Sequence, residues 1–514
     1  MAEACFAVLD FATGGGKCVI FDARGRCLAR VRKRWSFEPA PHEHEALTPG
    51  QSFDPHAFWL LLAECAQEAL ASAATEHGLD PSTIAGVTTT SLRLGTVLLD
   101  SRGREIYCAP NLDGRGFAGA LALLENLDRE AIVRTTGHWP PFLSSAARVI
   151  AYRQTEGAQQ PAWALSLADW LSFRLSGALS AEPSNSGETF FLDVASRRWS
   201  DQMLRACGCT ESLLPPLVEC GTQVGRVTSE AAERTGFPAG TPVFAGGADS
   251  QCALLAAGAV EDGEAAVVLG TTAPVMVAAN HPCIDRSGRL WAGCHVHAER
   301  WTLESNAGET GRGWEWLLSL FSLEGEDGFA TLESEIAAAE KTMRDAGEET
   351  LFAFAQPQIF DLDHYNPARM LGFGFRQTPF GNGAGPTRGE LLLSYVRNLA
   401  FAVRANLEQL QPHIAGGIRS IALTGGMSRS AAIRRHLARI LPVTTHATDE
   451  ADASPLGAAM LASVGAGVHA DLPAAIEAMS ASTTLVPDET LKPADEAAYE
   501  KWRELYSIAM QTSL

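Results

Sequence analysis

The segment DFATGGGK, residues 10–17, directly follows an apolar, strand-like run and combines a carboxylate, a hydroxyl, three glycines and a lysine. A glycine-rich turn after a strand lets backbone N–H groups approach a phosphate closely, and charged side chains supply the other contacts of a nucleotide and its metal ion. Similar turns occur later in the chain, GGAD at 246–249 with GTT at 270–272, and TGGMS at 424–428. Together these segments predict a phosphoryl-transfer site with ATP bound between two lobes.

The sequence around the first turn predicts a mixed α/β lobe. Residues 5–10 read as a strand, and residues 18–22 and 27–31 read as a hairpin that follows it. Apolar spacing predicts a helix over residues 55–77. A strand near 84–90 and a second hairpin over residues 96–107 follow this helix.

The second half of the chain repeats this order of elements. A strand at 242–245 ends at the glycine pair 246–247, and further strands precede the turns at 270–272 and 424–428. Helices are predicted at 250–259, 387–411, 430–441 and 454–466. We therefore predict a duplicated α/β fold with two lobes, residues 1–245 and residues 246–514, hinged near residue 245.

Composition excludes several classes of protein. The chain has 514 residues and 46% hydrophobic content, enough for two cores. Its formal net charge of −20, without a basic stripe, argues against a nucleic-acid partner. Eleven scattered cysteines are typical of reduced core thiols. Because no charged leader precedes a long apolar stretch, we expect a cytoplasmic protein with no membrane partner.

The order and spacing of the motifs resemble the FGGY family of carbohydrate kinases over nearly the whole chain. Residues 10–17 resemble the family's first phosphate loop, residues 246–249 its catalytic Gly-Gly-x-Asp, and residues 270–272 its second phosphate turn. Further matches lie at 113–115, 169–177, 183–186, 425–426 and 450–457. The resemblance implies a two-lobed, ribonuclease H-like fold of the actin and hexokinase type, with ATP and Mg²⁺ in the cleft.

Asp249 is the candidate catalytic base. Transfer of a γ-phosphoryl group to a hydroxyl requires that the hydroxyl lose its proton while the reactants are held in line. Asp249 lies on a loop between a predicted strand and helix, and the same position removes this proton in the family. The alternative is that Asp249 only caps the helix that begins at Ser250.

Asp10 is the second carboxylate, and we expect it to hold Mg²⁺ directly or through water while facing Asp249 across the nucleotide crevice. Lys17 either adds charge at the phosphates or points into solvent. The three successive glycines at 14–16 suggest a loop that stays flexible until nucleotide orders it. The other predicted nucleotide contacts are Thr13, Gly14, Gly270, Thr271, Thr272, Gly425, Gly426 and Ser428.

The acceptor site is predicted from the resemblance. Arg93 coincides with an arginine of glycerol kinases and autoinducer-2 kinases, where xylulokinases commonly carry Gln-Met-His-Gly, and its alternative is an ordinary surface arginine. Asn111 replaces the tryptophan of the family's Trp-x-Asp-x-Arg pattern, so Trp139 either supplies a flat wall for the acceptor or belongs to the core. The predicted acceptor contacts are Arg93, Leu94, Asp113, Trp139, Asp249 and Ser250.

The resemblance implies ATP-dependent phosphorylation of a small sugar or polyol, with a ketopentose as the first candidate. Arg93 and Asn111 favour an autoinducer-2-type or other unusual polyhydroxy acceptor instead. A non-catalytic sugar or nucleotide sensor and an acceptor-independent ATPase are alternatives of other classes. The two carboxylates count against the sensor, and the 113–115 segment counts against the ATPase. The sequence leaves open the acceptor, its reacting hydroxyl and the oligomeric state, for which a homodimer is one option.

Overall fold

The computed structural model describes residues 4–44, 48–322, 325–346, 351–361, 372–375, 385–448 and 452–511. Contacts within the chain divide it into two compact units. Unit 1 comprises residues 1–260, 278–303 and 452–480, and unit 2 comprises residues 261–277, 304–451 and 481–514. The division expected after residue 245 falls inside strand β13 (Pro242–Ala248), so this division differs from the expected one and Asp249 belongs to unit 1.

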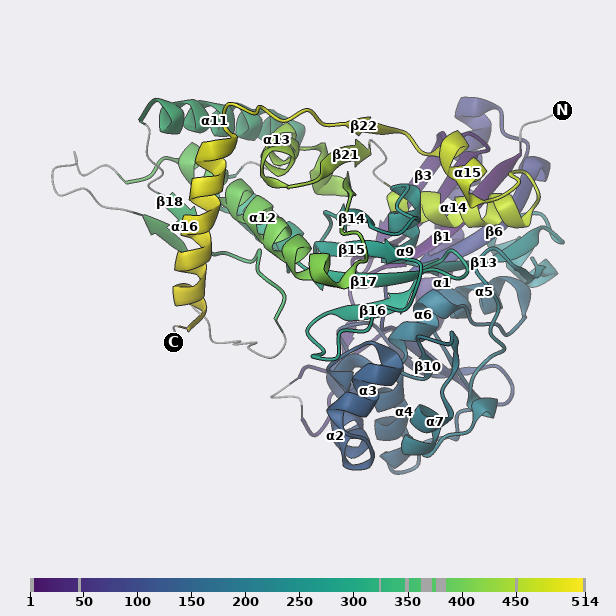
Figure 1. The fold of residues 1–514 in the computed structure, drawn as a ribbon. Helices are drawn as coiled ribbons and strands as arrows, with labels where there is room; N and C mark the ends of the chain where they lie inside the picture. The colour runs from purple at the N-terminus through teal and green to yellow at the C-terminus, as the bar shows by residue number, and fades with distance from the viewer. Residues whose placement is uncertain are drawn as a thin grey trace. The chain divides into compact units, whose positions relative to one another are not determined.

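Unit 1 is built on a six-stranded sheet (Figure 1). Its strand order is β12 (Gln223–Arg226), β13, β6 (Ile84–Ser91), β1 (Cys5–Ala12), β2 (Gly15–Asp22) and β3 (Cys27–Arg34). Strands β13, β6 and β1 run parallel, whereas β1, β2 and β3 form an antiparallel meander. Because the carboxyl ends of parallel strands meet at one edge of a sheet, the segments that follow β1, β6 and β13 lie close together.

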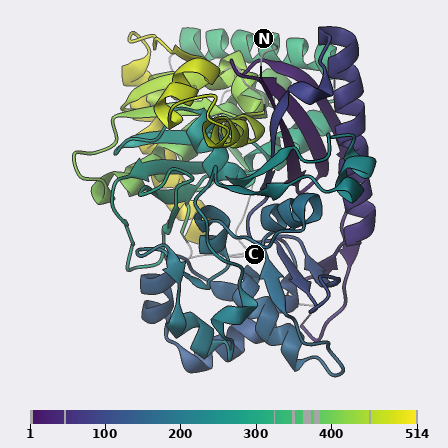
Figure 2. The ribbon, with the colours of Figure 1, turned by 90° about the vertical axis from the view of Figure 1, so that its right-hand side faces the viewer.

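The two faces of β1 bury different residues. Every second residue from Cys5 to Phe11 packs into a core with helices α1 (Pro55–His77) and α5 (Leu167–Ser176), and Figure 2 shows α1 beside the N-terminal strands. The residues between them point to the opposite face, where helix α14 (Ala453–Gly465) contacts β1, β6 and β13. Asp10 and its cross-strand partner Lys17 both lie on this α14 face.

The rest of unit 1 includes a smaller sheet with its own helices. The sheet has the order β8 (Glu105–Ala109), β7 (Thr96–Leu99), β9 (Trp163–Leu165). Apolar side chains of these strands and of helices α2 (Phe117–Asn126), α3 (Arg129–Thr136) and α4 (Ser145–Gln154) form a second core. Unit 1 also contains the helices α6 (Pro183–Glu188), α7 (Asp201–Ala206), α8 (Ser229–Thr235), α9 (Asp249–Ala256) and α15 (Leu472–Met479), and strand β16 (Trp291–Cys294).

Unit 2 contains five neighbouring strands. Their order is β15 (Pro274–Ala279), β14 (Glu264–Val268), β20 (Ser420–Thr424), β21 (Thr444–Thr448) and β22 (Ser482–Thr484), and β14, β20 and β21 run parallel. The long helix α12 (Arg388–Leu410) begins with a capping box between Thr387 and Glu390. Around it lie α11 (Gly325–Ala346), α13 (Ala431–Ile440) and α16 (Lys492–Gln511), and α10 (Thr310–Leu320) follows the β15 region in sequence.

The structure confirms the predicted helices at 55–77, 387–411, 430–441 and 454–466 to within one or two residues. The expectation of a flexible loop at 14–16 is wrong for Gly15 and Gly16, because both lie in β2. A Cβ atom at Gly15 would collide with the carbonyl oxygen of Lys33, and one at Gly16 would collide with the ring of Trp35. These two glycines therefore allow close packing against the next strand and its end.

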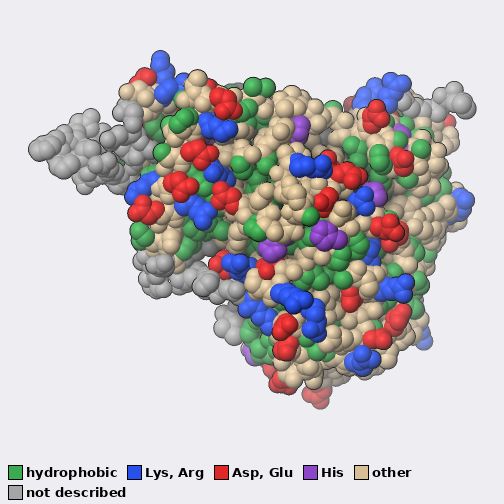
Figure 3. Space-filling view, in the orientation of Figure 1, with side chains coloured by type: hydrophobic (Ala, Val, Ile, Leu, Met, Phe, Trp, Pro, Cys, Tyr) green, Lys and Arg blue, Asp and Glu red, His purple; other side chains and the backbone are tan. Residues whose placement is uncertain are grey.

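The surface and the thiols add three observations. On the face that Figure 3 shows, Lys and Arg side chains are interspersed with Asp and Glu side chains. All eleven cysteines are free thiols, and most are buried. No helix in the described part of the chain has the length and apolar character needed to cross a membrane.

Candidate active site

Asp10 lies near the carboxyl end of β1, beside two other charged side chains. The Lys17 ammonium is 3.1 Å from Asp10 Oδ2 and 2.8 Å from Asp452 Oδ1, and it donates a hydrogen bond to Asp452. Asp452 immediately precedes α14 and also pairs with Arg30 of β3. The alternative in which Lys17 points into solvent is therefore wrong, because cross-strand pairing places its ammonium between two carboxylates.

Burial and ion pairing act against each other in this cluster. Asp10 is only 3% exposed, and burial raises its pKa even though Lys17 acts to lower it. Burial acts to lower the pKa of Lys17, but Asp10 and Asp452 outweigh it and the pKa is raised. Among the described residues, Asp10 Oδ1 is a buried oxygen with no hydrogen-bond partner. A cation bound at Oδ1 would satisfy that oxygen.

Replacing Lys17 with methionine is expected to destabilise unit 1 by about 3 kcal/mol, because it leaves two buried carboxylates without their shared cation. In Lys17→Met the pKa of Asp10, already raised in the wild type, should rise further. The loss in free energy of unfolding should be largest above the pKa of the variant, where Asp10 is ionised, and should shrink at lower pH, where Asp10 takes up a proton. Urea denaturation of both proteins at pH 8 and pH 5, followed by tryptophan fluorescence, measures the difference. A deficit that does not depend on pH would show that Lys17 stabilises the fold through packing alone.

Asp249 is the first residue of α9, directly after β13. Asp10 and Gly247 both lie opposite Thr90 of the intervening strand β6, so Asp10 and Asp249 are at the same edge of one sheet. The Gly-Gly pair is needed there, because a Cβ at Gly246 would collide with the carbonyl oxygen of Thr89. We expected Asp10 and Asp249 on different lobes, but both belong to unit 1.

The surroundings of Asp249 suit a base. Its Oδ1 accepts hydrogen bonds from the backbone N–H of Ser250 at 2.6 Å and from the Ser250 hydroxyl at 3.1 Å. The pKa of Asp249 is raised to about 6, mainly by burial; the charge of Arg93 acts to lower it, that of Asp10 to raise it, and the hydrogen bonds from Ser250 to lower it. Ala248 occupies the N-cap position of α9 and Asp249 is its first residue, whose side chain contacts the first turn through the N–H of Ser250.

Arg93 belongs to a buried ion-pair cluster. Its Nη1 lies 3.2 Å from Glu188 Oε1, and Glu188 Oε2 lies 3.4 Å from His138 Nε2. Burial acts to raise the pKa of Glu188, but Arg93 and His138 lower it to about 2. The Arg93 side chain is only 13% exposed, and its charge affects the pKa of Asp249. The alternative of an ordinary surface arginine is therefore wrong.

The aromatic ring near Arg93 comes from a residue that the sequence did not single out. The Arg93 guanidinium lies 5.9 Å from the ring centre of Trp291 in β16, and Trp291 also contacts His138. Trp139 packs against the second core of unit 1 and under Arg129, and its carbonyl oxygen accepts a hydrogen bond from Trp291 Nε1. Trp139 therefore packs against the core, and the aromatic ring beside Arg93 is that of Trp291.

Asp113 is predicted as an acceptor contact, but its carboxylate is 0% exposed. It accepts hydrogen bonds from Tyr107, from Arg115 and from the backbone N–H of Gln51. Its oxygens are therefore engaged within the chain, which differs from the predicted contact. Leu94, also predicted as an acceptor contact, has a left-handed backbone with φ of 63°.

The predicted nucleotide turns of unit 2 lie at the carboxyl ends of adjacent parallel strands, β14 and β20. Thr271 and Thr272 are exposed, and the turn is closed by a hydrogen bond from the N–H of Gly270 to the Thr272 carbonyl oxygen. Gly425 has φ of 91°, and a Cβ there would approach the Leu269 carbonyl oxygen to 2.7 Å, so glycine is required. Both turns present backbone groups at one edge of the sheet.

Four other predicted nucleotide contacts lie in or beside these and the first glycine turn. Thr13 and Gly14 form the two-residue turn between β1 and β2, and Gly14 is exposed. Gly426 is exposed beside Gly425. Ser428 is buried and its hydroxyl donates to the Gly425 carbonyl oxygen at 2.7 Å, so it fixes the turn rather than facing a ligand.

The predicted adenosine-side segment 450–457 is only partly described. Glu450 lies outside the described residues. Asp452 to Gly457 belong to unit 1, where a Cβ at Gly457 would collide with the carbonyl oxygen of Cys252 in α9. Gly457 therefore allows close packing of α14 against α9.

Models of two protein domains match this chain. The model described as the FGGY family of carbohydrate kinases, N-terminal domain, matches residues 5–256, and the C-terminal domain model matches residues 265–466. The chain belongs to the FGGY family of carbohydrate kinases. This FGGY kinase is therefore an enzyme, a phosphotransferase that acts on carbohydrates.

Individual relatives agree with this assignment. The FGGY kinase is 28% identical to the putative sugar kinase YoaC of Bacillus subtilis, over 97% of this chain and 96% of that protein. It is 29% identical to the autoinducer-2 kinase of Escherichia coli K12, over 97% of this chain and 93% of that protein. Its fold matches a xylulose kinase from Rhodospirillum rubrum with a TM-score of 0.79 at 23% identity, over 98% of each chain. It also matches a Plasmodium falciparum glycerol kinase with ADP, with a TM-score of 0.80 at 16% identity, over 100% of this chain and 99% of that chain.

Sequence reasoning missed four charged or polar residues of this FGGY kinase. Glu188 and Asp452 lie just after or inside segments that were matched, at 183–186 and 450–457, but no role was given to them. His138 was part of the segment 138–142, in which attention went to Trp139. Arg148 stands alone in the apolar stretch 146–151, and an isolated charge in such a stretch signals a buried ion pair.

Proposed function

We propose that this FGGY kinase transfers the γ-phosphoryl group of ATP to a hydroxyl of a small, uncharged polyhydroxy compound, with a ketopentose as the first candidate. The observation that supports the proposal most is the grouping of Asp10, Asp249 and Arg93 at the carboxyl edge of the unit 1 sheet. This grouping combines a candidate base, a candidate metal ligand and a candidate acceptor contact.

Asp249 acts as the base in this proposal. Its hydrogen bonds from Ser250 orient one carboxylate oxygen, and its pKa of about 6 leaves it ionised near neutral pH while keeping it basic enough to take the hydroxyl proton. Desolvation of the carboxylate causes the raised value. The proton moves from the acceptor hydroxyl to Asp249 as the oxygen attacks phosphorus, and ADP leaves.

The glycine turns of unit 2 bind the nucleotide in this proposal. Gly270, Thr271 and Thr272 offer N–H groups and exposed hydroxyls to the phosphates, and Gly425 and Gly426 let adenosine lie against backbone. The exposed turn of Thr13 and Gly14 in unit 1 contacts the phosphoryl group that is transferred. Lys17 contributes to the site by positioning Asp10, because its ammonium is held between Asp10 and Asp452.

Asp10 fits a Mg²⁺ ion. Its Oδ1 is a buried carboxylate oxygen without a hydrogen-bond partner among the described residues, and oxygen ligands of this kind are what Mg²⁺ prefers. When bound, Mg²⁺ would neutralise phosphate charge.

The acceptor class follows from the charges around Arg93. Glu188 pairs with both Arg93 and His138, and Trp291 adds an aromatic surface, so the site offers hydrogen bonds and an aromatic contact with part of its positive charge compensated. This combination suits a neutral polyhydroxy compound better than a phosphorylated one. An autoinducer-2-type acceptor is the second candidate, and Arg93 together with the relatives of that name supports it.

A panel of acceptors tests the proposed function. The protein is incubated with ATP, Mg²⁺ and one ketose or polyol at a time, and ADP release is followed together with the mass of the product. We expect ADP release with at least one ketopentose or autoinducer-2-type compound. ATP binding without turnover on any acceptor would contradict the proposal and favour the sensor.

The acid limb of the kcat/KM profile is expected near pH 6, because Asp249 accepts a proton only when it is ionised. Activity should be constant above this pH and fall about tenfold per pH unit below it.

Arg93→Leu should move this acid limb to higher pH, because Arg93 lowers the pKa of Asp249. The variant should also raise the KM for the acceptor more than the KM for ATP. A limb that stays in place in Arg93→Leu, with an unchanged acceptor KM, would remove Arg93 from the site.

A further inference from the structure

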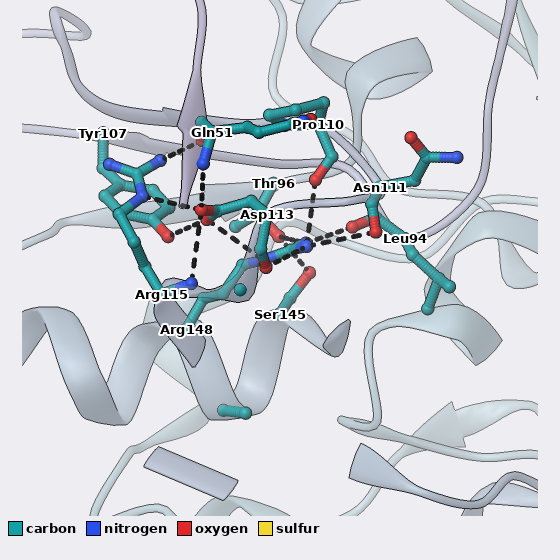
Figure 4. Close-up of polar contacts among 12 residues, drawn as sticks. Gln51, Leu94, Thr96, Tyr107, Pro110, Asn111, Asp113, Arg115, Ser145 and Arg148 are labelled. Atoms are coloured by element: carbon teal, nitrogen blue, oxygen red, sulfur yellow. Dashed lines mark hydrogen bonds and ion pairs between the residues drawn. The ribbon is translucent and has the colours of Figure 1, made fainter. Parts of the chain in front are cut away.

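One buried arginine of α4 connects the two loops that carry Arg93 and Asn111. Arg148 is 0% exposed, and Figure 4 shows its guanidinium between the loop of Leu94 and the loop of Pro110 to Asp113. Its Nη1 donates to the Leu94 carbonyl oxygen, and its Nη2 donates to the carbonyl oxygens of Pro110 at 2.9 Å and Asp113 at 3.1 Å. Arginine can do this because its guanidinium is a rigid, planar fork of donors.

The charge of Arg148 is balanced inside the same cluster. Its Nε lies 3.5 Å from Asp113 Oδ2, and both side chains are fully buried. Tyr107 donates to Asp113 Oδ2 at 2.7 Å from the other side, and this bond does not involve Arg148 (Figure 4). The cluster is therefore a paired buried charge, and the fork of Arg148 directs its hydrogen bonds toward both loops.

Leu94 explains why such a connection is needed. Its φ of 63° lies in the left-handed region, which is costly for a residue with a branched side chain. A conformation of this kind persists only where the surroundings fix it, and Arg148 holds the carbonyl oxygen of that residue. Because Leu94 directly follows Arg93, the turn also fixes the direction in which Arg93 leaves the backbone.

We propose that Arg148 is a positioning residue for the acceptor site, which holds Leu94 in its left-handed turn and thereby places Arg93 against Glu188 and beside Asp249. The proposal rests on the proposed function, in which Arg93 contacts the acceptor. Arg148 itself is buried and acts through Leu94. Its substitution should therefore affect acceptor binding and leave the nucleotide turns of unit 2 unchanged.

Arg148→Lys tests this step while it keeps the buried charge. Lysine carries one nitrogen, so it cannot hold both loops at once, and carbonyl groups of at least one loop lose a buried donor. We expect the acceptor KM to rise about tenfold to a hundredfold, the usual effect of leaving a buried acceptor unsatisfied, with an unchanged ATP KM. An equal rise in both KM values, or a change in neither, would overturn the proposal.

Two further variants separate positioning from stability. Tyr107→Phe removes a hydrogen bond to the same buried carboxylate but keeps every bond from Arg148 to the loops, so it should lower the melting temperature and keep the acceptor KM. Leu94→Gly removes the cost of the left-handed turn, so the double variant with Arg148→Lys should recover part of the lost acceptor affinity. If Tyr107→Phe raised the acceptor KM as much as Arg148→Lys, the effect would be one of stability and the proposal would fail.

Hydrogen exchange provides a readout that needs no acceptor. In Arg148→Lys we expect faster amide exchange in the peptide covering residues 91–96 and unchanged exchange in α12 of unit 2. Unchanged exchange at 91–96 would overturn the role of Arg148 whatever the enzyme phosphorylates. If the wild type phosphorylated no acceptor while exchange still rose at 91–96, the proposed function would fail and the positioning of the loop would stand.

Discussion

Asp249→Asn is expected to lower kcat by about 10²- to 10⁴-fold, the usual contribution of a positioned base. Asparagine has nearly the same shape as aspartate and still accepts from the N–H of Ser250, but it cannot take up the acceptor proton. Nucleotide affinity should be retained, because the predicted nucleotide turns at 270–272 and 425–426 belong to unit 2. Steady-state kinetics and isothermal titration with ATP measure both quantities.

Asp80→Asn is a matched control for this variant. Asp80 is an exposed aspartate of unit 1 that caps a short helical turn, and asparagine caps equally well. The control should have the kcat of the wild type. A kcat of Asp249→Asn close to that of the control would show that Asp249 is not the base.

Asp10→Asn is expected to raise the Mg²⁺ concentration needed for half-maximal activity by about 100-fold or more, since even the outer-shell partners of metal ligands cost about 10- to 100-fold when they are changed. The variant loses the charge of a buried carboxylate whose Oδ1 has no hydrogen-bond partner among the described residues. Titration of activity with MgCl₂ at saturating ATP measures the shift.

Asp452→Asn separates a metal ligand from a partner of Lys17. Both carboxylates contact the Lys17 ammonium, but the oxygens of Asp452 are engaged by Lys17 and Arg30. We therefore expect a much smaller shift in Mg²⁺ dependence for Asp452→Asn than for Asp10→Asn. Equal shifts in the two variants would mean that Asp10 acts on the metal only through Lys17.

Much of the fold could be predicted from the sequence because the signals were local. The spacing of apolar residues gave α1 and α12 nearly to the residue, and the glycine turns marked where β1, β14 and β20 end. The division of the chain was harder. Residues 452–480 return to unit 1, where α14 covers the face of β1 that carries Asp10, and this packing over a separation of more than 400 residues leaves no local signal.

The candidate site was predictable where a motif carried it and not where partners came from distant segments. Asp249 and Asp10 belong to glycine-containing motifs, and the structure brings them to one edge of one sheet. The role of Asp113 was misjudged because burial decides it, and Tyr107, Gln51 and Arg148 come from three other segments. Lys17 was left between two alternatives because its second partner, Asp452, is 435 positions away.

The most direct test of the central claim is the stoichiometry of product to ADP for the wild-type enzyme, measured with and without the best acceptor of the panel. We predict one phosphorylated acceptor for each ADP and almost no ADP release without an acceptor, because in the proposed function Asp249 takes its proton from an acceptor hydroxyl and not from water. ADP release that does not depend on an acceptor, or that yields inorganic phosphate in its place, would contradict this account.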